Sequence, residues 1–271
     1  MIFVCPKCKG KLNIDTECGT AKCDFGHSYD KSRFGYYNLL LGASSGNHGD
    51  NKEMVLARRE FLSKDFYKTL SQRVADQCKS VLRENGSILD MGCGEGYYTS
   101  EIRNKCKEKR SYIAVFDISK DAVREAAKKK CADEYAVASA YHMPVADESV
   151  DLIVNTFSPL ARDEVYRSLK KGGYFIMAIP AEEHLYGLKA AIYDTPYKNE
   201  VADTELEGFS LVSREEIKYP IYLNTDTDIK ALFMMTPYAY RTNAIGRERV
   251  LSLKELRCDA HFLILTYRKD I

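Results

Sequence analysis

Four side chains near the amino terminus have the types and the spacing of a metal site. Cys5 and Cys8 form a C-x-x-C pair, and Cys23 and His27 form a C-x-x-x-H pair about 15 residues further on. Three thiolates and one imidazole favour Zn²⁺, and four protein ligands leave no open position, so we predict one structural zinc ion. Cys18 competes for the third position, but Cys23 has the better partner in His27. A redox C-x-x-C pair or unrelated thiols are the weaker alternatives.

A second group of chemistry-bearing residues is the glycine-rich segment D-x-G-x-G-x-G, which begins at Asp90. Gly92, Gly94 and Gly96 lack side chains where a ligand must approach the backbone between a strand and a helix. Glu95 lies inside this turn, and its carboxylate would repel the diphosphate of a dinucleotide cofactor. It would tolerate the sulfonium and amino groups of S-adenosylmethionine, which is therefore the cofactor that we predict.

Further candidate residues follow predicted strands, where an open α/β sheet binds its ligand. Asp117 ends the second strand, and its carboxylate is placed to accept hydrogen bonds from both ribose hydroxyls. It could also cap the helix that follows, and the two roles can coexist. Ser139 and Ala140 come just after the third strand and would flank the adenine. Asn155 lies near the end of the fourth strand and would lie near the transferred methyl group.

These residues need a frame that brings them together. Short apolar segments alternate with helical ones, which predicts a doubly wound, mostly parallel, Rossmann-like α/β sheet. Combined with the predicted cofactor, S-adenosylmethionine, this sheet is expected to be of the class I methyltransferase type. The predicted strands span 87–91, 112–116, 135–138, 151–156 and 174–179, and the predicted helices between them span 97–107, 119–130 and 161–170. Lys171, Gly172 and Gly173 are expected to stop the last of these helices.

The chain divides into three predicted parts. They are a small zinc-binding domain (1–34), a linker and helical segment (35–80) and an S-adenosylmethionine-dependent methyltransferase domain (81–271). In the middle part, a polar, glycine-rich loop is expected over 42–50, and helical spacing of apolar residues predicts one helix around 54–62 and another around 70–81. Arg58 and Arg59 are interpreted as a solvated basic spot.

The composition excludes several classes of protein. The 271 residues are 45% hydrophobic and 29% charged, which is ordinary for a globular chain and unlike a disordered or collagen-like one. Forty basic residues face 39 acidic ones, and the resulting charge of +1 offers no general attraction to polyanions. The sequence has no secretory signal and no run of about 18 apolar residues. We therefore expect a cytoplasmic protein with reduced cysteines and no membrane partner.

Taken together, these segments resemble the bacterial 23S rRNA guanine-N1-methyltransferases of the RlmA family. The resemblance covers almost the whole chain and is carried by the cysteine–histidine segment, Gly49-Asp50-x-x-Glu53-Met54-x-x-Ala57-Arg58, the turn from Leu89 to Thr99, His184-Leu185 and Met235-Thr236-Pro237. It implies methyl transfer from S-adenosylmethionine to N1 of one guanine in a hairpin of domain II of 23S rRNA. That hairpin lies near the peptide exit tunnel, where macrolide antibiotics bind, so a link to macrolide resistance is implied as well.

The resemblance also assigns roles to residues. It implies that Tyr67, Gly94, Glu95 and His184 contact the cofactor. From the sequence alone, Tyr67 would be interpreted as a core residue of a helix and His184 as an isolated surface histidine. Guanine N1 carries a proton at neutral pH, so the enzyme must remove this proton or stabilise the deprotonated base. The general base is not identified; Asp50, Glu95 and His184 are the candidates. A homodimer is expected from the resemblance.

Two other functions stay open. A small-molecule methyltransferase would share the fold and the glycine turn, although the zinc segment argues against it. A non-catalytic RNA-binding protein is opposed by the intact turn and by Asp117. With rRNA as the substrate, the zinc segment would help to hold it, and Lys7, Lys9, Lys11 and Arg33 are available for phosphates. Nearby acidic residues make the local positive excess small.

Overall fold

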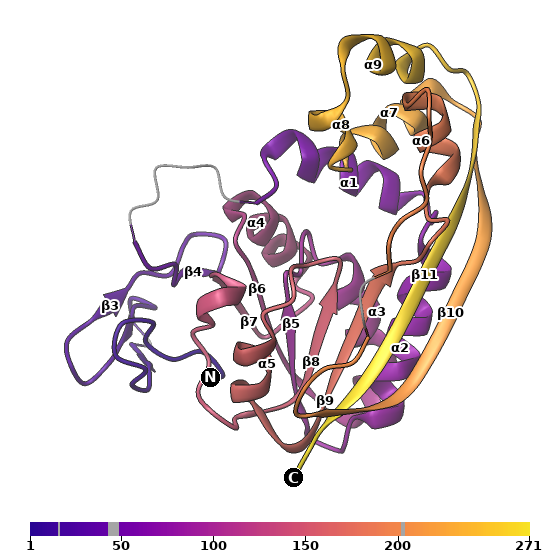
Figure 1. The fold of residues 1–271 in the computed structure, drawn as a ribbon. Helices are drawn as coiled ribbons and strands as arrows, with labels where there is room; N and C mark the ends of the chain where they lie inside the picture. Colours follow the sequence, from indigo (N-terminus) through magenta and orange to yellow (C-terminus); the bar gives the residue numbers. More distant parts are fainter. Residues whose placement is uncertain (16, 43–48, 202–203) are drawn as a thin grey trace.

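The computed structural model describes residues 1–15, 17–42, 49–201 and 204–271, and its central feature is an eight-stranded sheet (Figure 1). The strand order is β10-β11-β9-β8-β5-β6-β7-β4. The strands are β4 (Tyr37–Asn38), β5 (Ser87–Met91), β6 (Tyr112–Asp117), β7 (Glu134–Val137), β8 (Val150–Thr156), β9 (Leu169–Pro180), β10 (Phe209–Leu223) and β11 (Leu256–Lys269). β11 runs antiparallel to both neighbours, and the remaining pairs run parallel. The predicted doubly wound, mostly parallel sheet is confirmed.

Both faces of the sheet are covered. The helices are α1 (Lys52–Ser63), α2 (Lys68–Val81), α3 (Tyr97–Lys105), α4 (Lys120–Lys129), α5 (Arg162–Ser168), α6 (Tyr186–Ile192), α7 (Asp226–Met234), α8 (Tyr238–Arg241) and α9 (Ala244–Leu251), with short 3-10 turns at η1 (Lys107–Lys109) and η2 (Ala140–His142). Side chains alternate along each strand. In β5, Ile88 belongs to the core with α2, α3 and α4, whereas Leu89 and Met91 belong to the core with α5 and the amino-terminal segment.

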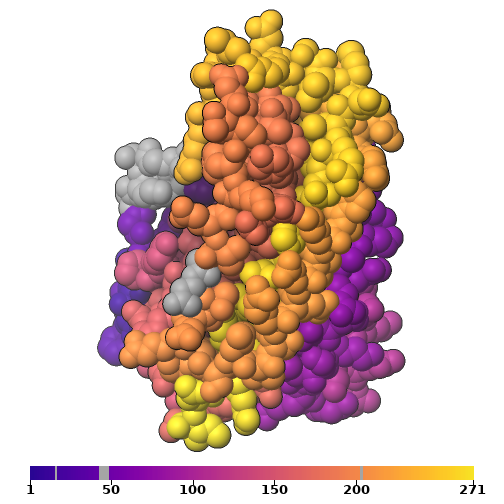
Figure 2. All heavy atoms as spheres, turned by 45° about the vertical axis from the view of Figure 1, so that its right-hand side comes forward, coloured from indigo at the N-terminus to yellow at the C-terminus, as the bar shows by residue number. Residues whose placement is uncertain are grey.

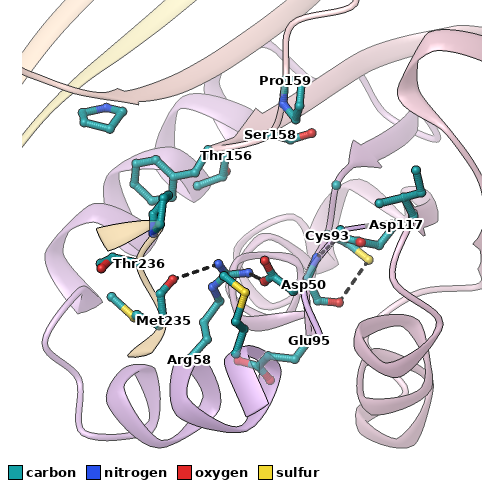
Figure 3. A pocket seen from close by; sticks show the side chains of 18 of the residues that line it. Asp50, Arg58, Cys93, Glu95, Asp117, Thr156, Ser158, Pro159, Met235 and Thr236 are labelled. Atoms are coloured by element: carbon teal, nitrogen blue, oxygen red, sulfur yellow. Dashed lines mark hydrogen bonds and ion pairs between the residues drawn. The ribbon is translucent and has the colours of Figure 1, made fainter. Parts of the chain in front are cut away.

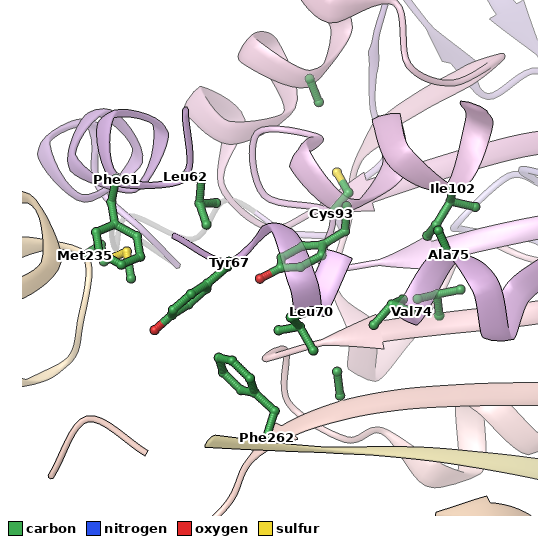
Figure 4. Close-up of a cluster of buried hydrophobic side chains, with 14 of the residues drawn as sticks. Phe61, Leu62, Tyr67, Leu70, Val74, Ala75, Cys93, Ile102, Met235 and Phe262 are labelled. Atoms are coloured by element: carbon green, nitrogen blue, oxygen red, sulfur yellow. The ribbon is translucent and has the colours of Figure 1, made fainter. Parts of the chain in front are cut away.

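The core under α2 and α3 reaches the place where the chain enters α2 (Figure 4). Tyr67 immediately precedes α2 and is buried between Phe61 of α1 and Phe262 of β11. Its ring meets each of these rings edge-on, at a centroid separation of 5.0 Å in both cases. Such edge-to-face contacts stabilise aromatic pairs beyond the burial of their area. Tyr67 is therefore held between α1 and β11 at the start of α2.

One predicted boundary is wrong. Lys171, Gly172 and Gly173 were expected to separate a helix from a strand, but α5 ends at Ser168 and these residues lie within β9. The register explains the difference, because Val150 pairs with Leu169 while Leu152 pairs with Tyr174. The extra residues on β9 form a bulge, and Gly172 adopts a φ of +69° there. A bulge and a helix stop use the same glycine chemistry, which is why the sequence pattern did not separate them.

The middle part of the chain does not stand apart from the sheet. α1 packs against α4 and α7, and α2 packs against α3, β9 and β11. Both helices were predicted from apolar spacing and are confirmed. Most of the loop expected over 42–50 falls on residues 43–48, which lie outside the described residues. The division into three parts stays a prediction.

The amino-terminal segment forms its own small sheet of β1 (Asn13–Ile14), β2 (Ala21–Lys22) and β3 (Ser28–Tyr29). It is attached to the main body by main-chain hydrogen bonds. The N–H groups of Ile2 and Phe3 donate to the carboxylate of Glu134 at 2.8 and 3.2 Å, and the N–H of Val4 donates to the carbonyl of Pro144 at 2.8 Å. Figure 1 shows the segment on the β4 side of the sheet.

The carboxyl-terminal half of the chain builds a cap, which we define as α6 to α9 (186–192 and 226–251). β10 and β11 extend past the body of the sheet and carry α7, α8 and α9 between them (Figure 1). In the space-filling view, the orange and yellow segments run from this cap down one side of the molecule (Figure 2). In the described part of the chain, every helix is too short or too polar to span a membrane.

Candidate active site

A pocket of about 650 Å³ lies between the carboxyl ends of the central strands and the cap (Figure 3). Its size is typical of a site for a small organic ligand. The structure brings six of the eight predicted cofactor-binding residues to its wall: Tyr67, Gly92, Gly94, Glu95, Asp117 and His184. Ser139 and Ala140, which were expected to flank an adenine, line it too. The carboxyl-end position agrees with the general location of ligands in open α/β sheets.

The glycine turn is tied to β6 and leaves one residue open to the pocket. The N–H groups of Gly92 and Cys93 both donate to the carbonyl of Phe116, at 2.9 and 3.0 Å. A Cβ atom on Gly94 would meet no heavy atom within 4 Å, so its backbone faces empty space. A Cβ atom on Gly92 would lie 2.4 Å from Ser158 Oγ. Gly94 therefore permits the approach of a ligand, whereas Gly92 permits close packing against the loop after β8.

Asp117 is the last residue of β6, and each of its carboxylate oxygens accepts one main-chain hydrogen bond. Oδ2 accepts the N–H of Gly94 at 2.9 Å, and Oδ1 accepts the N–H of Ser119 at 2.8 Å. Burial raises the pKa of Asp117 above its usual value. A carboxylate oxygen can accept more than one hydrogen bond, so lone pairs are left for a diol. The helix-capping role considered for Asp117 belongs to Ser119, whose hydroxyl accepts from the N–H of Ala122.

Glu95 is buried beside the turn but is already neutralised. Its carboxylate forms an ion pair with Lys129, near the end of α4. The repulsion of a diphosphate that was inferred from Glu95 alone is therefore weaker than the sequence suggested, because a lysine lies against the same carboxylate. The partner comes from 34 residues further along the chain, and no local pattern could have shown it.

Asp90 and Gly96 lie behind the turn and do not line the pocket. The carboxylate of Asp90 is buried and accepts the hydroxyl of Thr99 in α3. A Cβ atom on Gly96 would lie 2.7 Å from Cys131 Sγ, and the φ of Gly96 is +80°. These two residues therefore join β5, the turn and α3, and their predicted direct contact with the cofactor is not supported by their position.

The buried carboxylate of Asp90 makes a testable contribution to stability. Burial raises the pKa of Asp90 to about 6, against about 3.9 in an unfolded chain. Between these values the folded protein holds a proton that the unfolded chain has lost, so the free energy of unfolding falls as pH rises from about 4 to 6, by about 3 kcal/mol. We expect Asp90→Asn to remove most of this fall in urea titrations. The control is Asp163→Asn, because Asp163 is exposed. If the unfolding free energy changed equally with pH in the wild type and both variants, the contribution assigned to Asp90 would be contradicted.

Tyr67 and His184 form a hydrogen-bonded pair at the pocket wall. Tyr67 Oη lies 3.3 Å from His184 Nε2, and the N–H of His261 donates to His184 Nδ1 at 3.3 Å. Burial lowers the pKa of His184 to about 3, so the imidazole is neutral at pH 7. Because Nδ1 accepts, Nε2 carries the proton and donates to Tyr67. The hydroxyl proton of Tyr67 is then directed away from His184. The prediction that His184 is an isolated surface residue is wrong, because the side chain is buried and bonded at both nitrogens.

This arrangement predicts the effect of removing one hydroxyl. If Tyr67 donates to the cofactor, we expect Tyr67→Phe to weaken the binding of S-adenosylhomocysteine about 10-fold, since one hydrogen bond to a charged group is worth roughly 1.5–3 kcal/mol. The matched control is Tyr219→Phe, because Tyr219 is a tyrosine outside the pocket whose hydroxyl donates to the carbonyl of Phe66. Calorimetric titration measures both. Equal affinities for the two variants would exclude this role of Tyr67.

A charged bridge at the pocket mouth was missed by sequence reasoning. The guanidinium of Arg58 in α1 forms an ion pair with Asp50 (Figure 3). It also donates a hydrogen bond of 3.3 Å to the carbonyl of Met235. The carbonyl of Asp50 in turn accepts the hydroxyl of Ser119 at 2.7 Å. Arg58 is thus not the solvated residue that was expected. It connects the segment before α1, the end of β6 and the cap.

The three candidates for a general base all have partners. Asp50 is paired with Arg58, and Glu95 with Lys129. Both nitrogens of His184 are engaged, and its low pKa shows that the imidazole is a poor proton acceptor. Their position therefore does not single out any of them as the base.

Asn155 does not occupy the expected position either. Its side-chain Oδ1 accepts the N–H of Ser158 at 3.0 Å, and its Nδ2 donates to the carbonyl of Pro159 at 3.3 Å. It lies under the loop after β8 and holds that loop, and Phe157, Ser158 and Pro159 line the pocket instead. The strand end was predicted correctly, but Thr156 and the three residues after it line the pocket there, and Asn155 does not.

The amino-terminal cluster fits a zinc ion. The ligand atoms of Cys5, Cys8, Cys23 and His27 all lie within 4.8 Å of one another. His27 Nδ1 lies 3.5 Å from Cys5 Sγ and 3.4 Å from Cys23 Sγ, and Cys8 Sγ lies 3.6 Å from Cys23 Sγ. A tetrahedral site with Zn–S bonds of about 2.3 Å has edges of roughly 3.8 Å, close to these values. The donor set suits one structural Zn²⁺, and it contains Cys23 rather than Cys18, which is exposed and lies outside the cluster.

Of the basic residues proposed for RNA phosphates, two have other contacts. The Nζ of Lys9 donates to the carbonyl of Met143 at 2.9 Å and helps to attach the zinc segment to the body. The guanidinium of Arg33 lies 4.7 Å from the ring centroid of Phe34. Lys7 and Lys11 are exposed. The basic patch is therefore smaller than the sequence suggested.

Comparison with known proteins agrees with this geometry. A family model described as "Methyltransferase domain" matches residues 89–177. A Streptomyces fradiae protein named 23S rRNA (guanine(748)-N(1))-methyltransferase is 27% identical over 229 residues, which are 82% of this chain and 80% of that protein. A Bacillus subtilis protein with the name "Putative 23S rRNA (guanine-N(1)-)-methyltransferase YxjB" is 28% identical over 265 residues. These residues are 94% of this chain and 92% of the relative.

A solved structure supports the fold. A chain in the complex of the Haloferax volcanii Trm112 methyltransferase activator with a methyltransferase is 17% identical, with a TM-score of 0.51 over 82% of this chain and 100% of that chain. The fold, the glycine turn and the matching domain define this chain as an S-adenosylmethionine-dependent methyltransferase of class I. Within that class, it is a homologue of the 23S rRNA guanine-N1-methyltransferases.

Proposed function

We infer that this enzyme methylates N1 of one guanine in a hairpin of domain II of 23S rRNA, near the peptide exit tunnel. The observation that carries the proposal is that one chain combines a zinc-type segment with a methyltransferase pocket. In addition, a relative named for methylation of guanine N1 in 23S rRNA matches 94% of the chain. The resemblance carried by the sequence motifs points to the same substrate. The proposal places the reaction in the cytoplasm, with unmodified rRNA as the partner.

The cofactor roles of the pocket residues belong to this proposal. Asp117 would accept hydrogen bonds from the ribose, and the open backbone at Gly94 would lie against the cofactor. Tyr67 would donate its hydroxyl proton to the polar end of the methionine part, with His184 holding the tyrosine in the donating orientation. Ser139 and Ala140 would lie beside the adenine. S-adenosylmethionine supplies the methyl group as a carbon activated by a sulfonium.

The reaction is a displacement at this methyl carbon. Once the N1 proton has passed to water or to a base, the lone pair of guanine N1 would form the new bond to carbon. The carbon–sulfur bond would break at the same time, and S-adenosylhomocysteine would leave with that electron pair. The protein then contributes mainly by positioning guanine N1 in line with the methyl carbon, because holding two reactants together makes a bimolecular step effectively unimolecular. The acceptor must also expose its Watson–Crick edge, so the guanine has to be unpaired or turned out of the RNA.

The experiment that tests the proposal compares acceptors. Purified enzyme and S-adenosylmethionine with a labelled methyl group are incubated with 23S rRNA that lacks the modification, and separately with a pool of small metabolites. We expect label in the RNA. Label only in small molecules would contradict the proposal and favour the alternative of a small-molecule methyltransferase. The Asp117→Asn variant serves as the control for transfer that depends on the pocket.

The predicted homodimer also belongs to the proposal. A single chain of this size offers limited surface to an RNA hairpin, and a second copy would extend it. Sedimentation velocity of the zinc-loaded protein, with and without the hairpin, measures this. A 30.8 kDa species without the hairpin, together with one chain per hairpin in the complex, would contradict the prediction.

A further inference from the structure

Phe157 has an unusual backbone for an aromatic residue. It directly follows β8 and adopts a φ of +61°, in the left-handed region that bulky side chains rarely enter. Strain of this kind persists only where the surroundings impose it, and it is concentrated at functional sites. An explanation is needed for why the chain keeps a phenylalanine at such a position.

The neighbouring groups hold the strained turn in place. The N–H of Phe157 donates to the carbonyl of Ala178 in β9 at 3.1 Å. The amide of the buried Asn155 bonds to the main chain of Ser158 and Pro159, as described above. Together these contacts determine the direction of the Phe157 side chain. The loop is thus rigid, and its geometry comes from residues that do not themselves reach the pocket.

The turn presents the ring of Phe157 to the pocket. The ring joins an aromatic cluster, with centroid separations of 5.5 Å to Phe262, 6.2 Å to Tyr98 and 6.4 Å to Tyr67. Tyr67, Tyr98 and Phe262 are buried, but Phe157 is 40% exposed and lines the cavity. The arrangement is therefore an anchored aromatic ring with part of its surface uncovered inside a pocket.

Two hydroxyl groups in the same pocket lack partners. Tyr98 Oη and Thr156 Oγ1 are buried and have no hydrogen-bond partner among the described residues, and both residues line the cavity. Tyr98 and Thr156 are 9% and 8% exposed. Buried polar groups are nearly always hydrogen-bonded, so these two indicate a polar ligand. The pocket thus offers a flat apolar surface together with groups for a polar edge.

The strand order places this surface at the reactive end of the cofactor. In the proposed function, the ribose binds at Asp117 on β6 and the cofactor passes over the glycine turn after β5. β8 is the next strand on the other side of β5. Ser158 lies against Gly92 of that turn, so the loop containing Phe157 borders the cofactor beyond the turn. A group bound there is an acceptor candidate.

We propose that Phe157 is the surface on which the acceptor base stacks, and that the ligand of this half of the pocket is a planar purine base turned out of its RNA. The proposal rests on the proposed function and names the acceptor site that the function requires. Stacking of a base on an aromatic side chain contributes about 5- to 150-fold in binding, and every base has the flat face that it needs. The unpartnered hydroxyls of Tyr98 and Thr156 are available to the polar edge of the base.

The first experiment uses the fact that the chain contains no tryptophan. Phe157→Trp introduces a single indole whose fluorescence a stacked base quenches. The full-length, zinc-loaded protein is first saturated with S-adenosylhomocysteine and then titrated with a transcript of the domain II hairpin, and we expect saturable quenching in the second step. The control is Tyr112→Trp, because Tyr112 is also 40% exposed but begins β6, so it lies at the amino-terminal end of the parallel strands, whereas Phe157 follows the carboxyl end of β8. Hairpin binding without quenching at position 157 would overturn the proposal.

The second experiment measures catalysis. Phe157→Leu keeps an apolar side chain but removes the flat ring, and we expect kcat/KM for the RNA to fall about 5- to 150-fold while the affinity for S-adenosylhomocysteine changes less than twofold. Phe157→Tyr is expected to restore most of the activity. Equal losses of RNA methylation and cofactor affinity would assign Phe157 to the cofactor instead and overturn the proposal.

The two proposals can fail separately. If the wild-type enzyme methylates RNA and Phe157→Leu is as active, the acceptor surface is wrong and the function stands. If the wild-type enzyme does not methylate or bind the hairpin, the proposed function is wrong, and guanosine monophosphate becomes the probe. Quenching of Phe157→Trp by this nucleotide would still support a surface for a purine base, and no quenching would exclude it.

Discussion

Replacing Cys8 by serine is expected to remove zinc from the protein and to unfold its amino-terminal segment. Cys8 Sγ lies 3.6 Å from Cys23 Sγ within a cluster of four candidate ligands, so one ion bound there would join residues that are far apart in this segment. Structural zinc binds zinc-finger peptides with a free energy of about 10–16 kcal/mol at pH 7. Because Cys8 is one of four ligands, its loss is expected to cost about a quarter of this, roughly 3 kcal/mol, which lowers the zinc affinity about 100-fold. The segment is too small to keep its fold by apolar burial alone.

The matched control is Cys18→Ser, because Cys18 lies in the same segment, is exposed and is not part of the cluster. After dialysis against a chelator, the wild-type protein and Cys18→Ser should retain one zinc per chain by mass spectrometry, whereas Cys8→Ser should retain none. Limited proteolysis should cleave Cys8→Ser within the first 34 residues and leave this segment intact in the other two proteins. The pocket lies elsewhere, so all three should bind S-adenosylhomocysteine. Zinc retained by Cys8→Ser would show that the ligand set is wrong.

Asp117→Asn is expected to weaken cofactor binding by at least 100-fold. The carboxylate accepts the N–H groups of Gly94 and Ser119, one on each oxygen. An amide would turn an NH₂ group toward one of these donors and would lose the charge that favours the two ribose hydroxyls. Two hydrogen bonds to a charged group are worth roughly 3 kcal/mol or more, which corresponds to about 100-fold.

Calorimetric titration with S-adenosylhomocysteine measures this loss. Asp121→Asn is the control, because Asp121 lies in the next helix, is only partly buried and pairs with Arg124. We expect the control to bind like the wild-type protein and to share its melting temperature. An affinity of Asp117→Asn within threefold of the wild-type value would show that the ribose binds elsewhere in the pocket.

The frame of the site could be predicted because its signals are local. The strand before the glycine turn, the turn itself and Asp117 lie within a short stretch of chain, and their order alone indicates where a ligand binds. The zinc cluster was equally accessible, since ligand type and spacing separate Cys23 from Cys18. For Tyr67 and His184, the family resemblance supplied what the residues alone did not, and their pairing at 3.3 Å explains why both reach the pocket.

The remaining features depend on contacts between distant parts of the chain. Lys129 neutralises Glu95, and Met235 accepts from Arg58 across the pocket mouth. The left-handed turn at Phe157 depends on hydrogen bonds made by Asn155 and by the neighbouring strand. The spacing of these residues in the sequence does not predict such contacts, because they form only when distant parts of the chain pack together. The sequence therefore predicted where the pocket lies, while its ion pairs and the exposed ring of Phe157 became visible only in the structure.

The most direct test of the account is to map the methyl group on the RNA. 23S rRNA that lacks the mark is incubated with the enzyme and S-adenosylmethionine, and the position is located by reverse transcription, which stalls where N1 of a guanine is blocked, and by mass spectrometry of the digested nucleosides. We predict one N1-methylguanosine, at a single guanine of the domain II hairpin. A methyl group on another atom, on another part of the RNA or on no RNA at all would contradict the account.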